Sequence, residues 1–245
     1  MTPVQSRRNS GVTVGHVAFA IGMVASGVLN LANRDFYSPW LPIPAWVPAR
    51  AWLGVASGAL MALAGVGLVM KRTAAFSAGV LFVFTLVFLV ALKTPPLLAE
   101  PRIELHWLDY GQIAVLVAGA LTLATTNETL LRAARYLLGA ALVPIGLSHF
   151  FYLKIATPMV PAVLPFREAW VIFTGTAHIA AGVAILAGIL ARLAAILEAI
   201  MLTAFAVLVW VAPLLATPRD INLWVELVVT VAVANGVWAV ASKMR

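Results

Sequence analysis

The sequence predicts an all-α integral membrane protein with eight transmembrane helices, arranged as two parallel four-helix repeats. Three observations carry this prediction: the composition, the spacing of the apolar segments, and a loop sequence that occurs twice. Of the 245 residues, 63% are hydrophobic and only 10% are charged, whereas a soluble domain carries about 25% charged residues. Too few polar side chains exist to cover a surface that faces water, so the bilayer is the expected solvent for most of the chain.

Eight apolar segments are long enough to cross a bilayer, which takes about 20 helical residues. They cover residues 15–33, 50–70, 73–93, 107–125, 134–153, 168–190, 193–215 and 223–242. The gaps at Lys71–Arg72, Thr125–Arg135 and Ala191–Arg192 fall on the side of both termini, and basic residues dominate there. The opposite loops are rich in proline, with acids and bases near balance. Because basic residues favour the cytoplasmic side, we expect both termini in the cytoplasm and the chain in the bacterial inner membrane.

The formal net charge of +7 has a membrane explanation. The basic residues lie in short gaps between apolar segments, so they orient the helices and do not indicate a nucleic-acid partner. The predicted partner is the lipid bilayer. The sequence contains no cysteine, which excludes disulfides, thiolate metal sites and a dithiol relay within this chain.

A loop and helix start recur in the two halves. Residues 97–109 read LLAEPRIELHWLD and residues 214–226 read LLATPRDINLWVE, and residues 58–68 align with 175–185 at the same offset. The predicted domains are therefore residues 1–126 and 127–245, each with four spans. An even number of spans starts the second repeat on the same side as the first, so the repeats are parallel and related by an axis along the membrane normal.

The second half carries a pattern of small and polar residues. Gly139, Gly146, His149 and Lys154 lie on the fifth span, and Thr174-Gly175, Ala181-Gly182 and Arg192 follow beyond a proline-containing loop. This pattern resembles the DoxX-like family of small four-helix membrane proteins, which includes the DoxD subunit of thiosulfate:quinone oxidoreductase. The resemblance implies a four-helix bundle per repeat, a quinone as the cofactor, and membrane or periplasmic redox proteins as partners. Where that family often has an acid in its second helix, this sequence has Met61 and His178.

Polar side chains within apolar spans mark the candidate site, because burying them in a bilayer is costly. The predicted ligand pocket opens toward the outer face of the second repeat and is lined by His149, Tyr152, Thr174, His178 and Glu226. His149 is expected one turn from the outer end of its span, and His178 about 15 Å deep in the next, nearly two helical turns apart in depth. No metal site is predicted.

Each of these residues also has a structural explanation. The histidines can be neutral and satisfied by a hydroxyl or carbonyl, and Glu226 can pair with Arg219. Glu198 can pair with Arg192 or face the inner interface. Pro144 is expected to kink the fifth span and open backbone carbonyls near His149 and Tyr152.

Three functions remain open from the sequence. The first is a quinone-linked redox membrane subunit, which the resemblance and the histidines favour. The second is a non-enzymatic membrane partner, since few residues are ionisable and small residues recur at helix-packing spacing. The third is a small-molecule or proton-coupled transporter, which a duplicated bundle with buried polar groups would suit. The sequence does not decide whether the protein is an enzyme.

Overall fold

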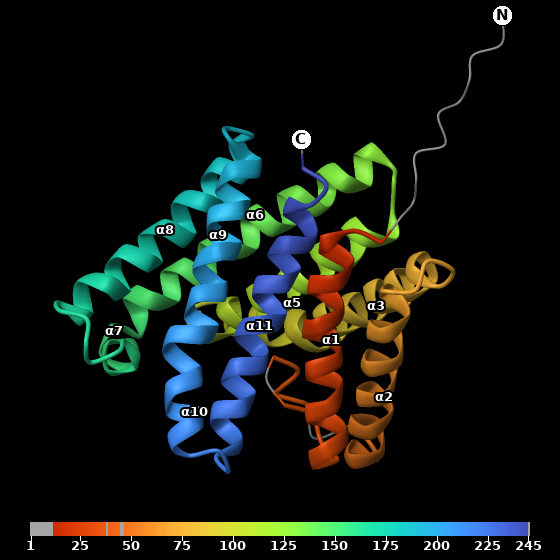
Figure 1. Ribbon diagram of the computed structural model, residues 1–245, viewed down its shortest axis with the longest axis horizontal. Coiled ribbons are helices and arrows are strands. Elements are labelled where there is room, and N and C mark those ends of the chain that lie inside the picture. Colours follow the sequence, from red (N-terminus) through yellow and green to blue (C-terminus); the bar gives the residue numbers. More distant parts are fainter. Residues whose placement is uncertain (1–11, 38, 45–46, 245) are drawn as a thin grey trace, which may run out of the picture.

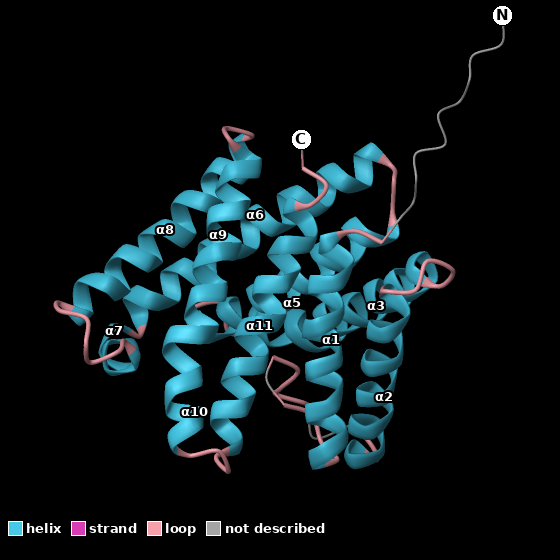
Figure 2. Ribbon diagram, in the orientation of Figure 1, coloured by secondary structure: helices cyan, strands magenta, loops and turns pink. Residues whose placement is uncertain are grey.

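The protein is all-helical over the part of the chain that the computed structural model describes, residues 12–37, 39–44 and 47–244 (Figures 1 and 2). These ranges contain no β-strand. Eight helices in them are long and apolar enough to cross a membrane, as the sequence predicts.

The first four of these helices lie in the first half of the chain. They are α1 (Val14–Asn33), α2 (Arg50–Leu68), a third helix and α5 (Glu104–Ala124). The third is continuous over Ala74–Ala99 and comprises α3 (Ala74–Val87), the π-helical segment η1 (Phe88–Lys93) and α4 (Thr94–Ala99). It runs six residues beyond the predicted end at residue 93. Pro95 and Pro96 do not stop it, because they directly follow the π-helical turn, in which the backbone N–H of Thr94 bonds to the carbonyl of Leu89, five residues earlier.

The second half has the same order of helices, with a short addition. The elements are α6 (Glu128–Phe151), α7 (Leu153–Ala156), the 3₁₀ turn η2 (Thr157–Met159), α8 (Arg167–Ala187), α9 (Ala191–Phe205), the π-helical segment η3 (Ala206–Val211), α10 (Ala212–Ala216) and α11 (Ile221–Ala241). Helices α9, η3 and α10 are continuous over Ala191–Ala216. Asn127 starts α6 by accepting hydrogen bonds from two backbone N–H groups, and Gly188 ends α8 in the left-handed conformation that glycine adopts without strain.

Helices α5 and α11 form the centre of the bundle. They pack against each other and are the most deeply buried of the eight. On one side α1 packs against α2 and α11, and on the other α6 packs against α5 and α8 (Figure 1). Helix α3 packs on α5, and α9 packs on α11. Each outer helix therefore has one face on the core and another without a neighbour among the described helices.

The outward faces of these helices are apolar. Large hydrophobic side chains that are more than half exposed occur on most of them: Trp52, Leu63, Phe76, Val83, Phe151, Phe173, Leu197 and Leu215. A soluble monomer rarely exposes contiguous apolar surface on this scale. The surface is one that needs an apolar surrounding.

Local features recur at a spacing of 117 residues. Ala49 and Phe166 precede α2 and α8, and both have positive φ, 50° and 53°. The indole N–H of Trp107 donates to the carbonyl of Pro101 at 2.9 Å, and that of Trp224 donates to Pro218 at 3.0 Å. Three pairs of helices start at matched positions with this spacing: Arg50 and Arg167, Ala74 and Ala191, Glu104 and Ile221.

Candidate functional site

The site is built at the crossing of α6 and α8, where the two backbones touch. A Cβ at Gly146 would lie 2.7 Å from the carbonyl oxygen of Gly175, so only glycine fits at this contact. A Cβ at Gly175 would likewise lie 2.7 Å from the Cβ of His149. His149 and His178 each follow one of these glycines by three residues, so the close approach brings the rings together, with centroids 4.9 Å apart. The predicted difference in depth between them is wrong, because α6 and α8 cross at this contact.

A third helix brings an acid to the pair. Glu198 on α9 places its Oε1 2.5 Å from Nδ1 of His178. Both residues are buried, with exposed fractions of 2% and 0%. His178 and Glu198 therefore form an ion pair or a strong hydrogen bond in apolar surroundings, where such contacts are stronger than in water.

The hydrogen bonds suggest the protonation of the rings. Nδ1 of His149 lies 3.0 Å from the carbonyl of Ile145, which can only accept, so Nδ1 carries the proton and Nε2 is left for another partner. Nδ1 of His178 donates to the Glu198 carboxylate. Within the described residues, Nε2 of His178 and Oε2 of Glu198 have no hydrogen-bond partner, although both atoms are buried. Buried polar atoms without partners are rare in proteins, and they mark places where a water, proton or ligand is held.

Phe205 closes one side of this group. Its ring centroid lies 6.0 Å from that of His178 and 6.3 Å from that of His149. It is the last residue of α9, directly before η3. A groove of about 330 Å³ lies farther along η3, between Leu208, Val209 and the loop at Pro158–Ala162. It is about the size of small-molecule pockets.

The other predicted pocket residues have different positions. The hydroxyl of Thr174, one turn before His178, donates to backbone carbonyls of its own helix. Tyr152 follows α6 and lies toward Glu104. Burial is the main cause that raises the pKa of Tyr152, and the negative charge of Glu104 raises it further. Glu226 on α11 makes no hydrogen bond or ion pair with either histidine among the described residues. The structure thus brings together His149 and His178, with Thr174 one turn away on α8, and the acid that faces His178 is Glu198 and not Glu226.

Glu198 carried a signal that the sequence reasoning missed. His178 and Glu198 each lie ten residues from Gly188, the glycine at the turn between α8 and α9. Residues equally far from a tight turn between antiparallel helices lie at the same depth. The interpretation of Glu198 as a partner of Arg192 is wrong, because its carboxylate reaches across from α9 to His178 on α8.

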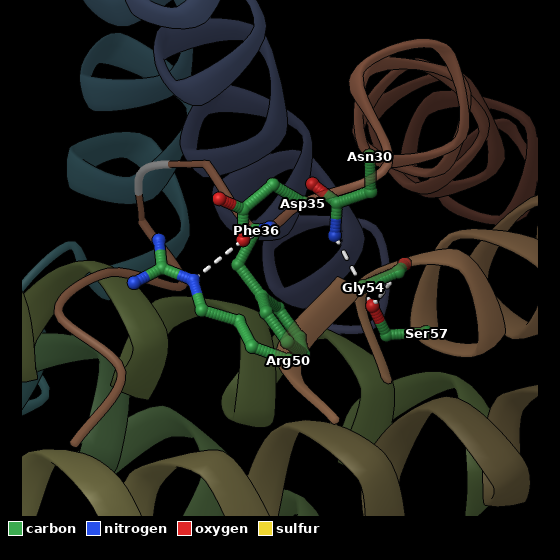
Figure 3. A network of polar contacts seen from close by, with 6 residues as sticks. All are labelled: Asn30, Asp35, Phe36, Arg50, Gly54 and Ser57. Atoms are coloured by element: carbon green, nitrogen blue, oxygen red, sulfur yellow. Dashed lines mark hydrogen bonds and ion pairs between the residues drawn. The ribbon is translucent and has the colours of Figure 1, made fainter. Parts of the chain in front are cut away.

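The first half has other residues at the matched positions. Met61 and Leu81 stand 117 residues before His178 and Glu198, and both are fully buried. Near the crossing of α1 and α2, Nδ2 of Asn30 donates to the hydroxyl of Ser57 at 3.2 Å, and this hydroxyl donates to Gly54 (Figure 3). The histidine–glutamate pair therefore has no counterpart in the first half.

The described part of the first half forms other ion pairs, among them Arg50 with Asp35 and Lys93 with Asp109. Nε of Arg50 lies 2.7 Å from Asp35, and its hydrogen bond lowers the pKa of that carboxyl (Figure 3). The ammonium of Lys93, at the end of η1, is 1% exposed and donates to Asp109 at 3.2 Å and to the carbonyl of Leu41. The partner of Asp109 is therefore a buried lysine of the same half.

The described residues contain no cluster of three or more histidine, cysteine or acidic side chains with the geometry of a metal site. Over residues 138–241, from α6 to α11, the chain is similar to the family described as a domain of unknown function (DUF8561). No curated protein and no solved structure matches it.

Proposed function

We propose that this protein is an integral inner-membrane protein of DoxX-like type that serves as the quinone-linked membrane subunit of a redox system. Its two halves are parallel four-helix repeats, and His178 and Glu198 form a proton-exchange site in the second. The observation that carries the proposal is the buried pair itself. Two titratable groups in apolar surroundings, each with one unpartnered atom, suit proton transfer better than structural support.

The membrane location is supported by the surface and by the direction of the helices. The outward faces carry large apolar side chains, which lipid would cover. The C-terminus and the turn between α8 and α9 lie at the top of Figure 1, and the turn between α10 and α11 lies at the bottom. Helices that alternate in direction in this way fit the cytoplasmic termini predicted by the basic residues.

The repeat is supported by the features at a spacing of 117 residues and by the packing. Under the pairing of α1 with α6, α2 with α8, α3 with α9 and α5 with α11, each contact of the first half has a counterpart in the second. The contact of α1 with α11 then matches that of α6 with α5. In Figure 1 α1 runs from top to bottom and α6 runs obliquely from upper right to lower left, so both start at the upper end, as parallel repeats require.

The chemistry of quinone reduction fits these side chains. A quinone that takes up two electrons also takes up two protons, one at each oxygen. A protonated His178, whose positive charge Glu198 stabilises, donates one proton from Nε2 and is neutral until it is protonated again, while the other quinone oxygen takes its proton from solvent. The electrons come from a partner redox protein, because this chain has no cysteine to relay them.

Proton-coupled transport of a small molecule is the second candidate. The observation that favours it is the position of the pair, buried between three helices close to η3, the π-helical interruption of the seventh span, which η1 matches in the third span. π-Helical turns occur frequently at functional sites. The third candidate function is that of a non-enzymatic membrane partner, in which His178 and Glu198 carry out no chemistry.

Quinone binding tests the proposal. We expect ubiquinone or menaquinone, titrated into protein in nanodiscs, to quench tryptophan fluorescence with an affinity that falls at least tenfold in the His178→Met/Glu198→Leu variant. Asn30→Ala/Ser57→Ala removes a buried polar pair from the first half and is the matched control, which should bind quinone normally. Equal affinity in all three proteins would refute the proposal. Proton uptake into liposomes with a soluble substrate, and no quinone binding, would favour the transporter.

A further inference from the structure

A basic pocket lies at the end of the bundle where the C-terminus leaves α11. It has a volume of about 220 Å³ and lies between the ends of α5, α6, α9 and α11. Arg132, Arg135 and Lys243 supply its charge, and apolar residues such as Leu131, Val240 and Met244 supply the rest of its wall. The pocket is thus cationic on one part of its surface and apolar on another.

These cationic side chains keep N–H groups that are not used in hydrogen bonds within the described residues. Nζ of Lys243 donates to the carbonyls of Thr122 and Thr125 at 2.7 and 3.1 Å, which uses two of its three N–H groups. Nε of Arg135 is buried and has no hydrogen-bond partner among the described residues. Among the same residues no carboxylate lines the pocket or pairs with these cations, although Glu128 lies one turn before Arg132.

The arginines and the lysine of this pocket have no arginine or lysine counterpart at the matched positions of the first half. If α1 matches α6 with Gly27 at the place of Gly146, the counterparts of Arg132 and Arg135 are Thr13 and His16, which hydrogen-bond to each other at 2.8 Å. The counterpart of Lys243 is Thr126. A general preference of cytoplasmic loops for basic residues would not concentrate three of them in one pocket.

We propose that this pocket binds the phosphate head group of an anionic phospholipid. Two arginines and a lysine without acidic partners suit a phosphate oxyanion, and arginine binds phosphate through two parallel hydrogen bonds. The volume is below the roughly 300–1,000 Å³ of pockets for whole drug-sized ligands. It therefore accommodates a head group, while the acyl chains lie along the exposed apolar faces of the neighbouring helices. The inference rests on the membrane location proposed above and not on quinone binding.

Lipid titration of the full-length protein in a neutral detergent tests this assignment. We expect phosphatidylglycerol to raise the thermal midpoint and phosphatidylcholine to leave it unchanged. Arg132→Gln/Arg135→Gln should raise the phosphatidylglycerol concentration that gives half of the thermal shift roughly 30-fold. This is the loss of affinity expected for two basic residues near a lipid surface. Lys243→Gln tests the same pocket from another helix, should the double variant not fold.

The control is Lys71→Gln/Arg72→Gln, which removes two cations from an exposed loop outside the pocket and should keep the full effect. Equal stabilisation by both lipids, or an unchanged response of the Arg132→Gln/Arg135→Gln and Lys243→Gln variants, would overturn the proposal. The same thermal measurement is made with millimolar inorganic phosphate in place of the lipid. If it reproduces the shift, the site takes a soluble phosphate and the lipid assignment is wrong. Quinone binding by the double variant stays normal if only the lipid site is lost.

Discussion

At the residue scale, His178 and Glu198 are stable in the bundle only as partners. Each is shielded from solvent, and each has the other as its one hydrogen-bond partner among the described side chains. Removing one partner of a buried pair leaves an uncompensated polar or charged group, whereas replacing both by apolar residues of similar size is often neutral or stabilising. The first half shows which apolar residues would fit, because Met61 and Leu81 fill the matched positions and are buried.

Thermal unfolding of three variants tests this coupling. His178→Met alone should destabilise the protein by about 3–5 kcal/mol, because it leaves the Glu198 carboxylate buried without a partner. The double variant His178→Met/Glu198→Leu should return to within about 1 kcal/mol of the original protein. The eight tryptophans give the fluorescence signal. Additive losses in the double variant would mean that the two side chains act independently.

The site was predictable in part at this scale. Histidines in apolar spans are conspicuous because of their cost, so His149 and His178 were identified from the sequence. Their contact was not, since it depends on where α6 and α8 cross, at Gly146 and Gly175. Glu226 was selected for its match with Asp109, a relation along the chain that does not place it near His178.

At the element scale, glycine contacts determine how α6 lies on α8. The two helices meet at Gly146 and Gly175, and again at Gly139 and Gly182, where a Cβ on Gly182 would lie 2.7 Å from the carbonyl oxygen of Gly139. Helix association in a bilayer relies on such close packing, because lipid chains remove the hydrophobic advantage of contact between helices. These glycines therefore set both the stability of the pair of helices and the distance between the histidines.

Alanine substitutions distinguish the effect of the close helix contact at Gly175 from the effect of helix propensity. Gly175→Ala should destabilise the protein by about 1–3 kcal/mol, since its methyl group meets His149 and backbone that cannot easily move. Gly79→Ala is the control, because a Cβ there has no atom within 4 Å and alanine favours a helix by up to about 1 kcal/mol. Thermal midpoints of the two variants compare them directly. A neutral Gly175→Ala would show that the crossing tolerates a wider separation.

The existence of the helices was predictable from hydropathy, but some of their ends were not. The third span was expected to stop before Pro95, since proline usually ends a helix. The structure instead continues through η1 into α4, and Thr94 donates its hydroxyl hydrogen to the carbonyl of Leu89. A π-helical segment changes the register of backbone hydrogen bonds, which sequence periodicity of 3.6 residues does not reveal.

At the scale of the whole molecule, the order of the helices and their contacts constrain how the protein would sit in a bilayer. If all eight long apolar helices cross the membrane, the chain returns to its starting side, and the basic pocket at Arg135 and Lys243 faces the cytoplasm when the termini do. The groove beside η3 then faces outward. The basic pocket and this groove therefore lie at opposite ends of the second half.

Cysteine labelling determines this orientation, and the absence of native cysteine makes each introduced thiol unique. Thr126→Cys and Ile189→Cys lie in exposed connections on the side of the C-terminus, whereas Val163→Cys and Thr217→Cys lie in exposed connections on the other side. A membrane-impermeant maleimide added to intact spheroplasts should label only the second pair, because basic residues hold the first side in the cytoplasm. Inside-out vesicles should show the reverse. Labelling of Ile189→Cys and Val163→Cys from the same side would mean that α8 does not cross the membrane, and the eight-span topology would be wrong.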